Sequence, residues 1–411
     1  MEPFPQAPNL WKHPTPDPSP EEEGKYKNNG EKMGNPLIGV AFHWLGGLAS
    51  ASFYVPYRGV KRWSWEVYWL TGGIFSWLLA PWFFARVQTN DLLGVLAATP
   101  SPNIWWPVFF GVLWGFGGLG YGLTMRYLGL SLGMAVVLGL CTVFGTLVPP
   151  LFLGDFHEKL LATTSGNIIL AGILLTLVGI IVVAMAGARK DAALSDAEKA
   201  AAVAEFDFKK GIVVAIFAGI MSACFAFGLA AGEPIKALSA AAGTGPLWTG
   251  LPVLCLVMFG GLITNALWCG YLVMKNRSAG QWFGRGVATD PAAQTASSEH
   301  GATFQPAAIA PGSTAPAKAP MLRNYLLCAV AGIAWYFQFF FYTMGESQMG
   351  IYGFSSWTLH MASIIIFGTL WGFAFREWKD AAPRVRGMVW GGVAILILAT
   401  IVIGYGNYRG A

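Results

Sequence analysis

The sequence predicts an all-α membrane protein with ten transmembrane helices in two inverted five-helix repeats. Three observations predict this fold class. Of the 411 residues, 55% are hydrophobic and 11% are charged, whereas soluble domains carry roughly 25% charged residues. Apolar runs of about 20 residues, long enough to cross the hydrocarbon as helices, recur along the chain. Short motifs of the first half return in the same order in the second half.

The apolar runs number ten, and each predicts one transmembrane helix. They cover residues 37–56, 66–86, 104–124, 129–153, 166–187, 211–232, 247–274, 322–343, 353–375 and 386–406. The first five runs form a predicted repeat over 37–188 and the last five a second repeat over 211–406. A cytoplasmic linker, residues 189–210, joins the two repeats.

Three motif pairs carry the repeat. Gly47–Phe53 (GLASASF) returns as Gly219–Phe225 (GIMSACF), and Phe144–Leu147 (FGTL) returns as Phe367–Leu370. Four residues of the third run recur at the same spacing in the eighth, the pairs being Gly111 and Gly332, Trp114 and Trp335, Phe116 and Phe337, and Tyr121 and Tyr342. Because each copy holds an odd number of spans, the second copy must cross the bilayer in the opposite direction. Inverted repeats are the architecture of secondary transporters, which hold their substrate near the midplane between the halves.

The basic residues predict the orientation in the membrane. Eighteen Lys and Arg follow spans 1, 3, 5, 7 and 9, in the connections or at their edges, and three follow spans 2, 4, 6 and 8. Short loops rich in Lys and Arg stay in the cytoplasm. Both termini are therefore predicted to be periplasmic. The net charge of +5 reflects this sidedness and does not indicate nucleic-acid binding.

Two further segments differ from the spans in composition. Residues 1–36 are rich in Pro, Glu and Lys and are predicted to be a disordered tail without a cleavable signal peptide. Residues 278–320, rich in Ala, Pro, Gly, Ser and Thr, are predicted to be a flexible cytoplasmic loop within the second repeat. All five cysteines lie inside apolar spans and are interpreted as packing residues.

The chain contains none of the motifs that mark common enzymes or ATP-driven pumps. It has no P-loop, no zinc-ligand spacing and no acyl-transfer motif. The sequence therefore predicts neither an enzyme nor a metal or cofactor site. Transport would draw its energy from an ion gradient or from the gradient of the substrate itself.

Two histidines inside the membrane are candidates for substrate or proton binding, because ionisable groups are costly in hydrocarbon. His43 in the first span shares a helical stripe with Ser50 and Tyr54. His360 lies in the ninth span, and the predicted orientation places both imidazoles at a similar depth. They are hypothesised to share a substrate hydroxyl or to relay a proton. The alternative is a structural role in helix–helix hydrogen bonding.

An aromatic face with an amide predicts a sugar-binding wall. Trp335, Gln338, Phe339 and Tyr342 share one face of the eighth span, and the C–H face of a sugar stacks on rings while its hydroxyls require hydrogen-bond partners. The third span repeats this pattern with Trp114 and Tyr121. Helix packing is the alternative interpretation of such a stripe.

Two more polar residues complete the candidates. Asn265 in the seventh span is a buried amide that could contact substrate. Glu66 begins the second span and is a third proton-coupling candidate after His43 and His360. An acidic residue in the first turn of a helix is also favoured by the helix dipole alone, and this structural interpretation of Glu66 is preferred.

At these residues the chain resembles the L-rhamnose–proton symporter family of the drug/metabolite transporter superfamily. The resemblance rests on residues 43–82 and 121–129, on WYFQFFFY at 335–342 and on SWTLHM at 356–361, and it extends from about residue 39 to 406. It implies ten helices in two inverted halves. It also implies uptake of a 6-deoxy-sugar with protons across a bacterial inner membrane, so the expected partners are a sugar, a proton and the lipid bilayer.

The resemblance leaves the particular sugar open, since few pocket changes would switch L-rhamnose to a related deoxy-sugar or hexose. A metabolite exporter or exchanger with the same fold is the main alternative, and a membrane sugar sensor is a weaker one. Direction of flux distinguishes the first alternative, and transport itself distinguishes the second. The oligomeric state is not predicted.

Overall fold

The structure, a computed structural model, describes residues 34–128, 130–193, 207–285 and 319–410. Within these ranges every regular element is a helix. The predicted disordered tail, except its last residues, lies outside the described ranges, as do the middle of the 189–210 linker and most of the 278–320 loop.

The first half of the chain holds five long helical segments. The first is α2 (Pro36–Ser52), which the short α3 (Tyr54–Tyr57) extends. The second consists of α4 (Trp65–Gly73), a π-helical stretch (Ile74–Leu79) and α5 (Ala80–Gln88). After the short α6 (Leu92–Ala98) come α7 (Ser101–Leu128), α8 (Leu130–Leu153) and, beyond a π-helical turn (His157–Leu161), α9 (Thr164–Ala192).

The second half repeats this count of long segments. Helix α11 (Phe208–Ala231) is followed by the short α12 (Glu233–Ala241) and by α13 (Leu251–Lys275). A short 3₁₀ helix (Ser278–Phe283) precedes α15 (Met321–Glu346), and another (Gly350–Ser355) leads into α16 (Ser356–Ala374). The last helix is α17 (Pro383–Gly410).

Nine helical segments among the described residues are long and apolar enough to cross a membrane. They start at residues 36, 65, 132, 164, 208, 251, 321, 350 and 383. Helix α7 is 28 residues long but is not one of the nine. Its tryptophans, tyrosines and glycines are less hydropathic than the aliphatic residues of the other spans. The fold class is therefore an all-helical membrane protein with at least nine candidate spans.

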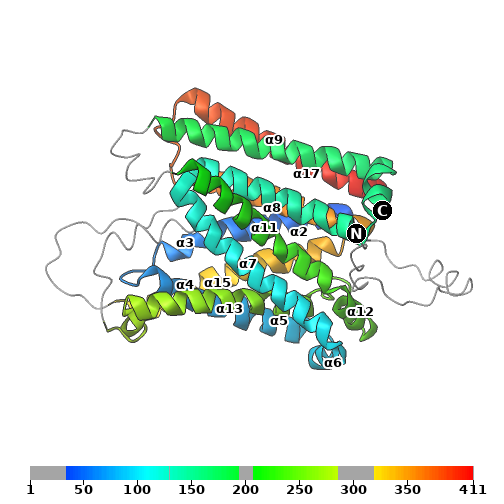
Figure 1. Ribbon diagram of the computed structural model, residues 1–411, viewed down its shortest axis with the longest axis horizontal. Helices are drawn as coiled ribbons and strands as arrows, with labels where there is room; N and C mark the ends of the chain where they lie inside the picture. Colours follow the sequence, from blue (N-terminus) through cyan, green and yellow to red (C-terminus); the bar gives the residue numbers. More distant parts are fainter. Residues whose placement is uncertain (1–33, 129, 194–206, 286–318, 411) are drawn as a thin grey trace, which may run out of the picture.

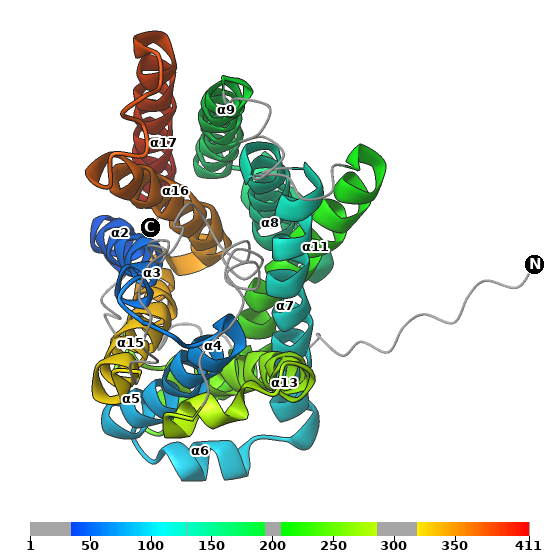
Figure 2. The same cartoon turned by 90° about the vertical axis from the view of Figure 1, so that its left-hand side faces the viewer.

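The helices form a bundle whose members run roughly along one axis (Figure 1). Seen end on in Figure 2, helices α2, α16, α8, α7, α4 and α15 surround the middle of the bundle. Helix α9 packs along α17 at the periphery, α7 packs against α11 and α13, and α2 packs against α15 and α16. Segments far apart in the sequence thus build every wall of the bundle.

Glycines permit close approach at four contacts between helices. A Cβ atom at Gly46 would lie 2.8 Å from the carbonyl oxygen of Gln338, where α2 crosses α15. At Gly111 on α7 a Cβ would collide with the backbone of α13, and at Gly332 on α15 it would collide with the backbone of α4. At Gly219 it would lie 2.7 Å from the Cβ of Leu140, where α11 meets α8. Small residues are the usual means of close helix approach in membranes.

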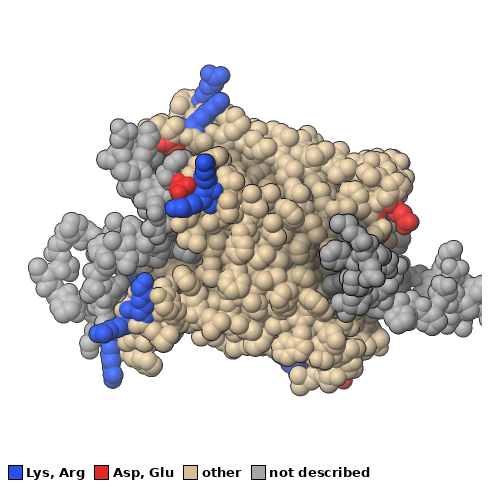
Figure 3. Space-filling model, in the orientation of Figure 1, with Lys and Arg blue, Asp and Glu red and all other residues tan. Residues whose placement is uncertain are grey.

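The face of the molecule seen in Figure 3 has an uncharged middle region. In Figure 3, Lys and Arg of the described residues gather mainly toward one end of the bundle, and the middle of the visible face carries no charged group. Large apolar side chains are exposed on the helices, among them Leu267 (72% exposed) and Val213 (67%). An apolar, uncharged belt of this kind suits contact with lipid tails.

Both ends of the described chain lie at the same end of the bundle. The backbone N–H of Asn35 donates to Oε1 of Gln348 at 3.0 Å, and a Cβ at Gly410 would touch Tyr352. Residues 348 and 352 lie in the connection between α15 and α16, so α2 begins and α17 ends beside that connection.

The prediction of a flexible loop over 278–320 is wrong for the first six of these residues. These residues form a 3₁₀ helix beneath the start of α4. The indole Nε1 of Trp282 donates to Thr71 Oγ1 at 2.9 Å, and the backbone N–H of Ser64 donates to Gln281 Oε1 at 2.6 Å. Side-chain hydrogen bonds therefore fix a segment whose composition alone suggested flexibility.

Candidate functional site

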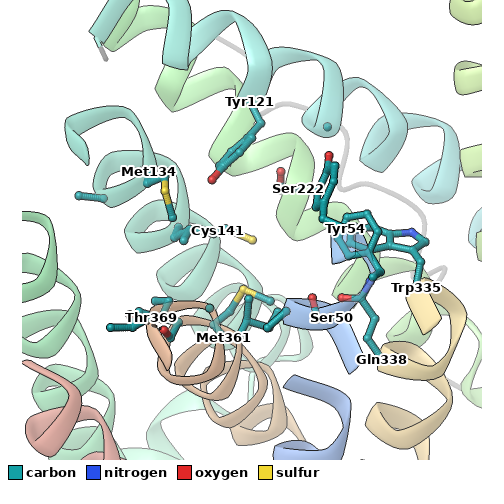
Figure 4. A pocket seen from close by; sticks show the side chains of 18 of the residues that line it. Ser50, Tyr54, Tyr121, Met134, Cys141, Ser222, Trp335, Gln338, Met361 and Thr369 are labelled. Atoms are coloured by element: carbon teal, nitrogen blue, oxygen red, sulfur yellow. Dashed lines mark hydrogen bonds between the residues drawn. The ribbon is translucent and has the colours of Figure 1, made fainter. Parts of the chain in front are cut away.

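A cavity of about 340 Å³ lies between the helices and is lined by side chains from both halves of the chain. Part of its lining is shown in Figure 4. It reaches one end of the bundle, where Lys190 and Asp191 of α9 and Glu377 and Trp378 between α16 and α17 form its mouth. Residues of the connections at the opposite end do not line it. The cavity is thus open at one end and closed at the other.

Eight of the eleven residues predicted to bind substrate line this cavity. In Figure 4, Ser50, Tyr54, Trp335 and Gln338 project into it from one side and Tyr121 from another. The complete set is Ser50, Tyr54, Trp114, Tyr121, Asn265, Trp335, Gln338 and Phe339. The inward faces of α2, α7, α13 and α15 thus include residues that the sequence singled out.

Aromatic rings support one another along the wall. The ring of Trp335 lies 4.3 Å from that of Phe53 and 5.9 Å, edge to face, from that of Phe339. Phe339 also meets Trp114 at 5.4 Å and stacks on Phe225 at 4.0 Å. Perpendicular and offset arrangements are the favourable ones for aromatic pairs. The rings that face the cavity are thus held in place by rings behind them.

Several buried hydrogen-bond donors at the wall have no partner among the described residues. They include Nε1 of Trp335 and Nε2 of Gln338, whose side chain is 2% exposed. A buried donor without a partner costs roughly 1–3 kcal/mol, and a bound hydroxyl group would remove that cost. Asn265 differs, since its Oδ1 accepts from Trp69 Nε1 at 3.1 Å and its Nδ2 donates to the carbonyl of Gly261 at 2.9 Å.

His43, His360 and Tyr342 do not line the cavity, contrary to the position expected for substrate-binding residues. They form a buried cluster between the cavity and the closed end. The ring centroids lie 6.5 Å apart for His43 and His360, 5.3 Å for His43 and Tyr342, and 5.4 Å for Tyr342 and His360. The sequence did place the two imidazoles at one depth, and the structure brings them together.

The histidine cluster touches the cavity wall from behind. The ring of His360 lies 6.3 Å from Phe339 and 6.3 Å from Trp357, both of which line the cavity. All four imidazole nitrogens of His43 and His360 are buried without a hydrogen-bond partner among the described residues. Ser363 Oγ donates instead to the backbone carbonyls of His43 and His360, at 2.9 and 2.7 Å. Both imidazoles therefore keep unused hydrogen-bonding capacity inside this buried cluster.

Glu66 occupies a different place from the other proton-coupling candidates. It lies in the first turn of α4 and is 4% exposed. Its Oε1 accepts from Asn276 Nδ2 at 3.0 Å and from Ser278 Oγ at 2.7 Å. These bonds tie α4 to the end of α13. The contacts favour the structural interpretation of Glu66.

Several lining residues escaped the sequence reasoning. Ser222 on α11 lines the cavity, and its position in the repeated motif matches that of Ser50, so the repeat itself was a signal for it. Trp357 and Met361 lie on the same helix as His360 and also line the cavity. Glu377 and Lys190 at the mouth carry no sequence pattern that separates them from ordinary loop charges.

A multi-pass helical membrane protein with a central, one-ended cavity has the architecture of a membrane transporter. Comparison with known proteins agrees. The profile of the L-rhamnose-proton symport protein (RhaT) family matches residues 33–281 and 305–408. This chain belongs to that family, whose members are symporters and not enzymes.

Curated relatives match nearly the whole chain. The L-rhamnose-proton symporter of Mannheimia succiniciproducens is 35% identical over 375 residues, which are 91% of this chain and 98% of the relative. The L-rhamnose-proton symporter of Citrobacter koseri is 33% identical over 371 residues, 90% of this chain and 97% of the relative. The L-rhamnose-proton symporter of Yersinia pestis is 33% identical over 374 residues, which are 90% of this chain and 98% of the relative.

Proposed function

We propose that this protein imports L-rhamnose together with protons across a bacterial inner membrane by alternating access. The observation that carries the proposal is the one-ended cavity, whose aromatic wall includes two unpartnered donors, in a chain that belongs to the L-rhamnose-proton symport protein family. A sugar offers C–H faces to the rings and hydroxyl groups to the Trp335 and Gln338 donors.

The proposed architecture is ten spans in two inverted repeats, with α7 as the tenth span. The helix contacts that glycines permit support it. Gly111 on α7 contacts α13, and its repeat equivalent Gly332 on α15 contacts α4. Gly47 on α2 contacts α16, and its equivalent Gly219 on α11 contacts α8. Each contact thus has a counterpart between the equivalent helices of the other repeat.

The proposed orientation puts the open mouth in the cytoplasm and both termini in the periplasm. Lys190 lies at the mouth, and Arg58, Lys61 and Arg62 follow α3 at the same end as that mouth. Loops rich in Lys and Arg remain in the cytoplasm. In this orientation the cavity is the inward-facing one, and the histidine cluster lies on its periplasmic side.

The proposed cycle uses the histidine cluster and the aromatic wall of the cavity in turn. With the outer side open, His43 or His360 takes a proton, and the sugar binds against Trp335 and Gln338. The halves then rock to the inward-facing arrangement, and both ligands leave through the mouth. Symport requires that each ligand favours the state that binds the other. The contact of His360 with Phe339 and Trp357 is the physical link between proton and sugar in this scheme.

Sugar-induced proton movement tests this function. Purified protein in proteoliposomes, without an imposed gradient, is given external L-rhamnose, and the external pH is recorded. Alkalinisation of the medium together with accumulation of labelled sugar under an inward proton gradient is the expected result. Uptake of the sugar with no proton movement under any gradient would refute symport. Efflux under that gradient would favour the exporter alternative.

A further inference from the structure

Glu377 stands at the mouth of the cavity and has no role in the scheme above. It lies in the connection between α16 and α17 and lines the cavity with Lys190, Asp191 and Trp378. Its side chain is half-buried. A Cβ atom at Gly372 would lie 3.4 Å from Glu377 Oε2, so the carboxylate folds back over the end of α16.

Two cations from the other half of the chain flank this carboxylate. Lys190 Nζ lies 5.0 Å from the ring centroid of Trp378. The guanidinium carbon of Arg58 lies 4.2 Å from the ring centroid of Phe375. Trp378 and Phe375 stand on either side of Glu377 in the sequence. Glu377 nevertheless forms no direct ion pair with a described residue. The opposite charges therefore face each other while the mouth is open.

The proton affinity of Glu377 suits exchange with the cytoplasm. Partial burial raises the pKa of the Glu377 carboxyl to about 7, and the positive charges of Lys190 and Arg58 offset part of that rise. The carboxyl is therefore neutral below about pH 7 and charged above it. The other charged groups on the surrounding elements are Lys61 and Arg62 after α3, Arg189 and Asp191 of α9, Arg376, Lys379 and Asp380 of the same connection, and Arg384 and Arg386 of α17.

We propose that Glu377 hands the transported proton to the cytoplasm, and that its charged form then draws the mouth closed against Lys190 and Arg58. This inference rests on the proposed symport function. The step is balanced: the carboxylic acid gives its proton to water in the mouth and becomes a carboxylate. Closure of the mouth brings that carboxylate to the cations and out of water, where charge pairs are stronger.

In this assignment the protonation state of Glu377 determines whether the empty carrier can close and turn outward. A carrier that still holds the proton has a neutral Glu377 and no attraction across the mouth, so it stays open to the cytoplasm or returns with sugar bound. A carrier that has lost the proton closes and turns outward. Proton release and the return step are thereby linked by one charge.

The test separates net transport from exchange in proteoliposomes. Glu377→Gln mimics the neutral acid permanently. We expect it to keep sugar counterflow at the wild-type rate and to lose net proton-driven accumulation by about tenfold or more. Lys190→Gln should lose accumulation in the same way, because it removes one of the attracting charges. Glu377→Asp and Asp191→Asn, the matched carboxylate at the same mouth, should both accumulate sugar.

The internal pH provides a second readout. At a constant pH difference across the membrane, wild-type net uptake should rise as internal pH increases from about 6 to about 8, whereas Glu377→Gln should show no such rise. A Glu377→Gln variant with wild-type accumulation and pH dependence would overturn the proposal. So would loss of counterflow in a variant that still binds sugar in a thermal-shift assay. Failure of the wild-type protein to couple sugar to protons would instead refute the proposed function.

Discussion

Tyr121 and Tyr342 occupy equivalent positions in the two repeated motifs, yet their surroundings differ. Tyr121 lines the cavity, whereas Tyr342 is 2% exposed, with its ring 5.3 Å from His43 and 5.4 Å from His360. Thr369 and Thr146 differ in the same way. Thr369 lines the cavity, and Thr146 is fully buried with its hydroxyl 2.8 Å from that of Thr358. The proposed inverted repeat, in which equivalent positions lie at opposite depths, would account for the difference within these two pairs.

The first prediction is that Tyr342 becomes exposed when Tyr121 becomes buried. Single cysteines replace Tyr121 or Tyr342 in a protein whose five native cysteines are changed to Ala. At rest, the cysteine at 121 should react with a thiol reagent supplied from the open side, and that at 342 should be protected. Conditions that favour the outward state should reverse the two rates. Unchanged rates for both positions would contradict alternating access.

The second prediction concerns the imidazoles. Replacing His43 or His360 with Gln keeps a polar side chain of similar size but removes the titratable group. Accumulation under a proton gradient should fall by about tenfold or more, and sugar exchange at equal pH should be spared. Uptake assays with and without a gradient measure both quantities. His157, which lies in the π-helical turn before α9, provides a matched His→Gln control. Wild-type accumulation in both variants would exclude the two histidines from coupling.

The third prediction concerns the unpartnered donors of Trp335 and Gln338. Trp335→Phe keeps a ring at the wall and removes the N–H group, and Gln338→Leu removes the amide. Each should weaken sugar binding by about 1–2 kcal/mol, or roughly five- to thirtyfold in Kd. Ligand-induced thermal shift measures the affinity, since a ligand of the folded form raises Tm. Gln348 lies at the opposite, closed end beside Asn35, and Gln348→Leu is the control with unchanged affinity.

The fourth prediction concerns the helix contact at Gly332. Gly332→Ala places a methyl group against the backbone of α4, which cannot move aside as a side chain would. The two helices must separate, at a cost of about 1–3 kcal/mol. Gly270→Ala on α13 is the matched control, because nothing lies within 4 Å of its added Cβ. The Tm should fall for Gly332→Ala only. Equal Tm values would show that the contact tolerates a wider spacing.

Much of the site followed from the sequence because helical periodicity fixes which side chains share a face. Ser50 and Tyr54 on α2, and Trp335, Gln338 and Phe339 on α15, therefore line one cavity as expected. The π-helical stretch at Ile74–Leu79 shows the limit of this reasoning. Its wider turns change the register of Trp77, which lines the cavity together with Trp65 and Trp69, and hydropathy carries no sign of that change.

The remaining features of the site depend on which end of the bundle is open. No local sequence pattern encodes this. His43, His360 and Tyr342 share helices with residues that line the cavity, but they are buried toward the closed end, where His360 lies behind Phe339 and Trp357. Glu377 lies outside the spans, and only the approach of α9 and the end of α3 to its connection gives it charged neighbours from the other half.

The mutual support of Trp335, Phe53, Phe339, Trp114 and Phe225 has a consequence for recognition. Side chains that are already confined by their neighbours have little rotational freedom left to lose when a ligand arrives. Binding costs of that kind reach about 0.5–1.5 kcal/mol for each mobile side chain. A wall of interlocked rings largely avoids them, so a small, strongly hydrated molecule can be captured by a few hydrogen bonds and a flat apolar surface.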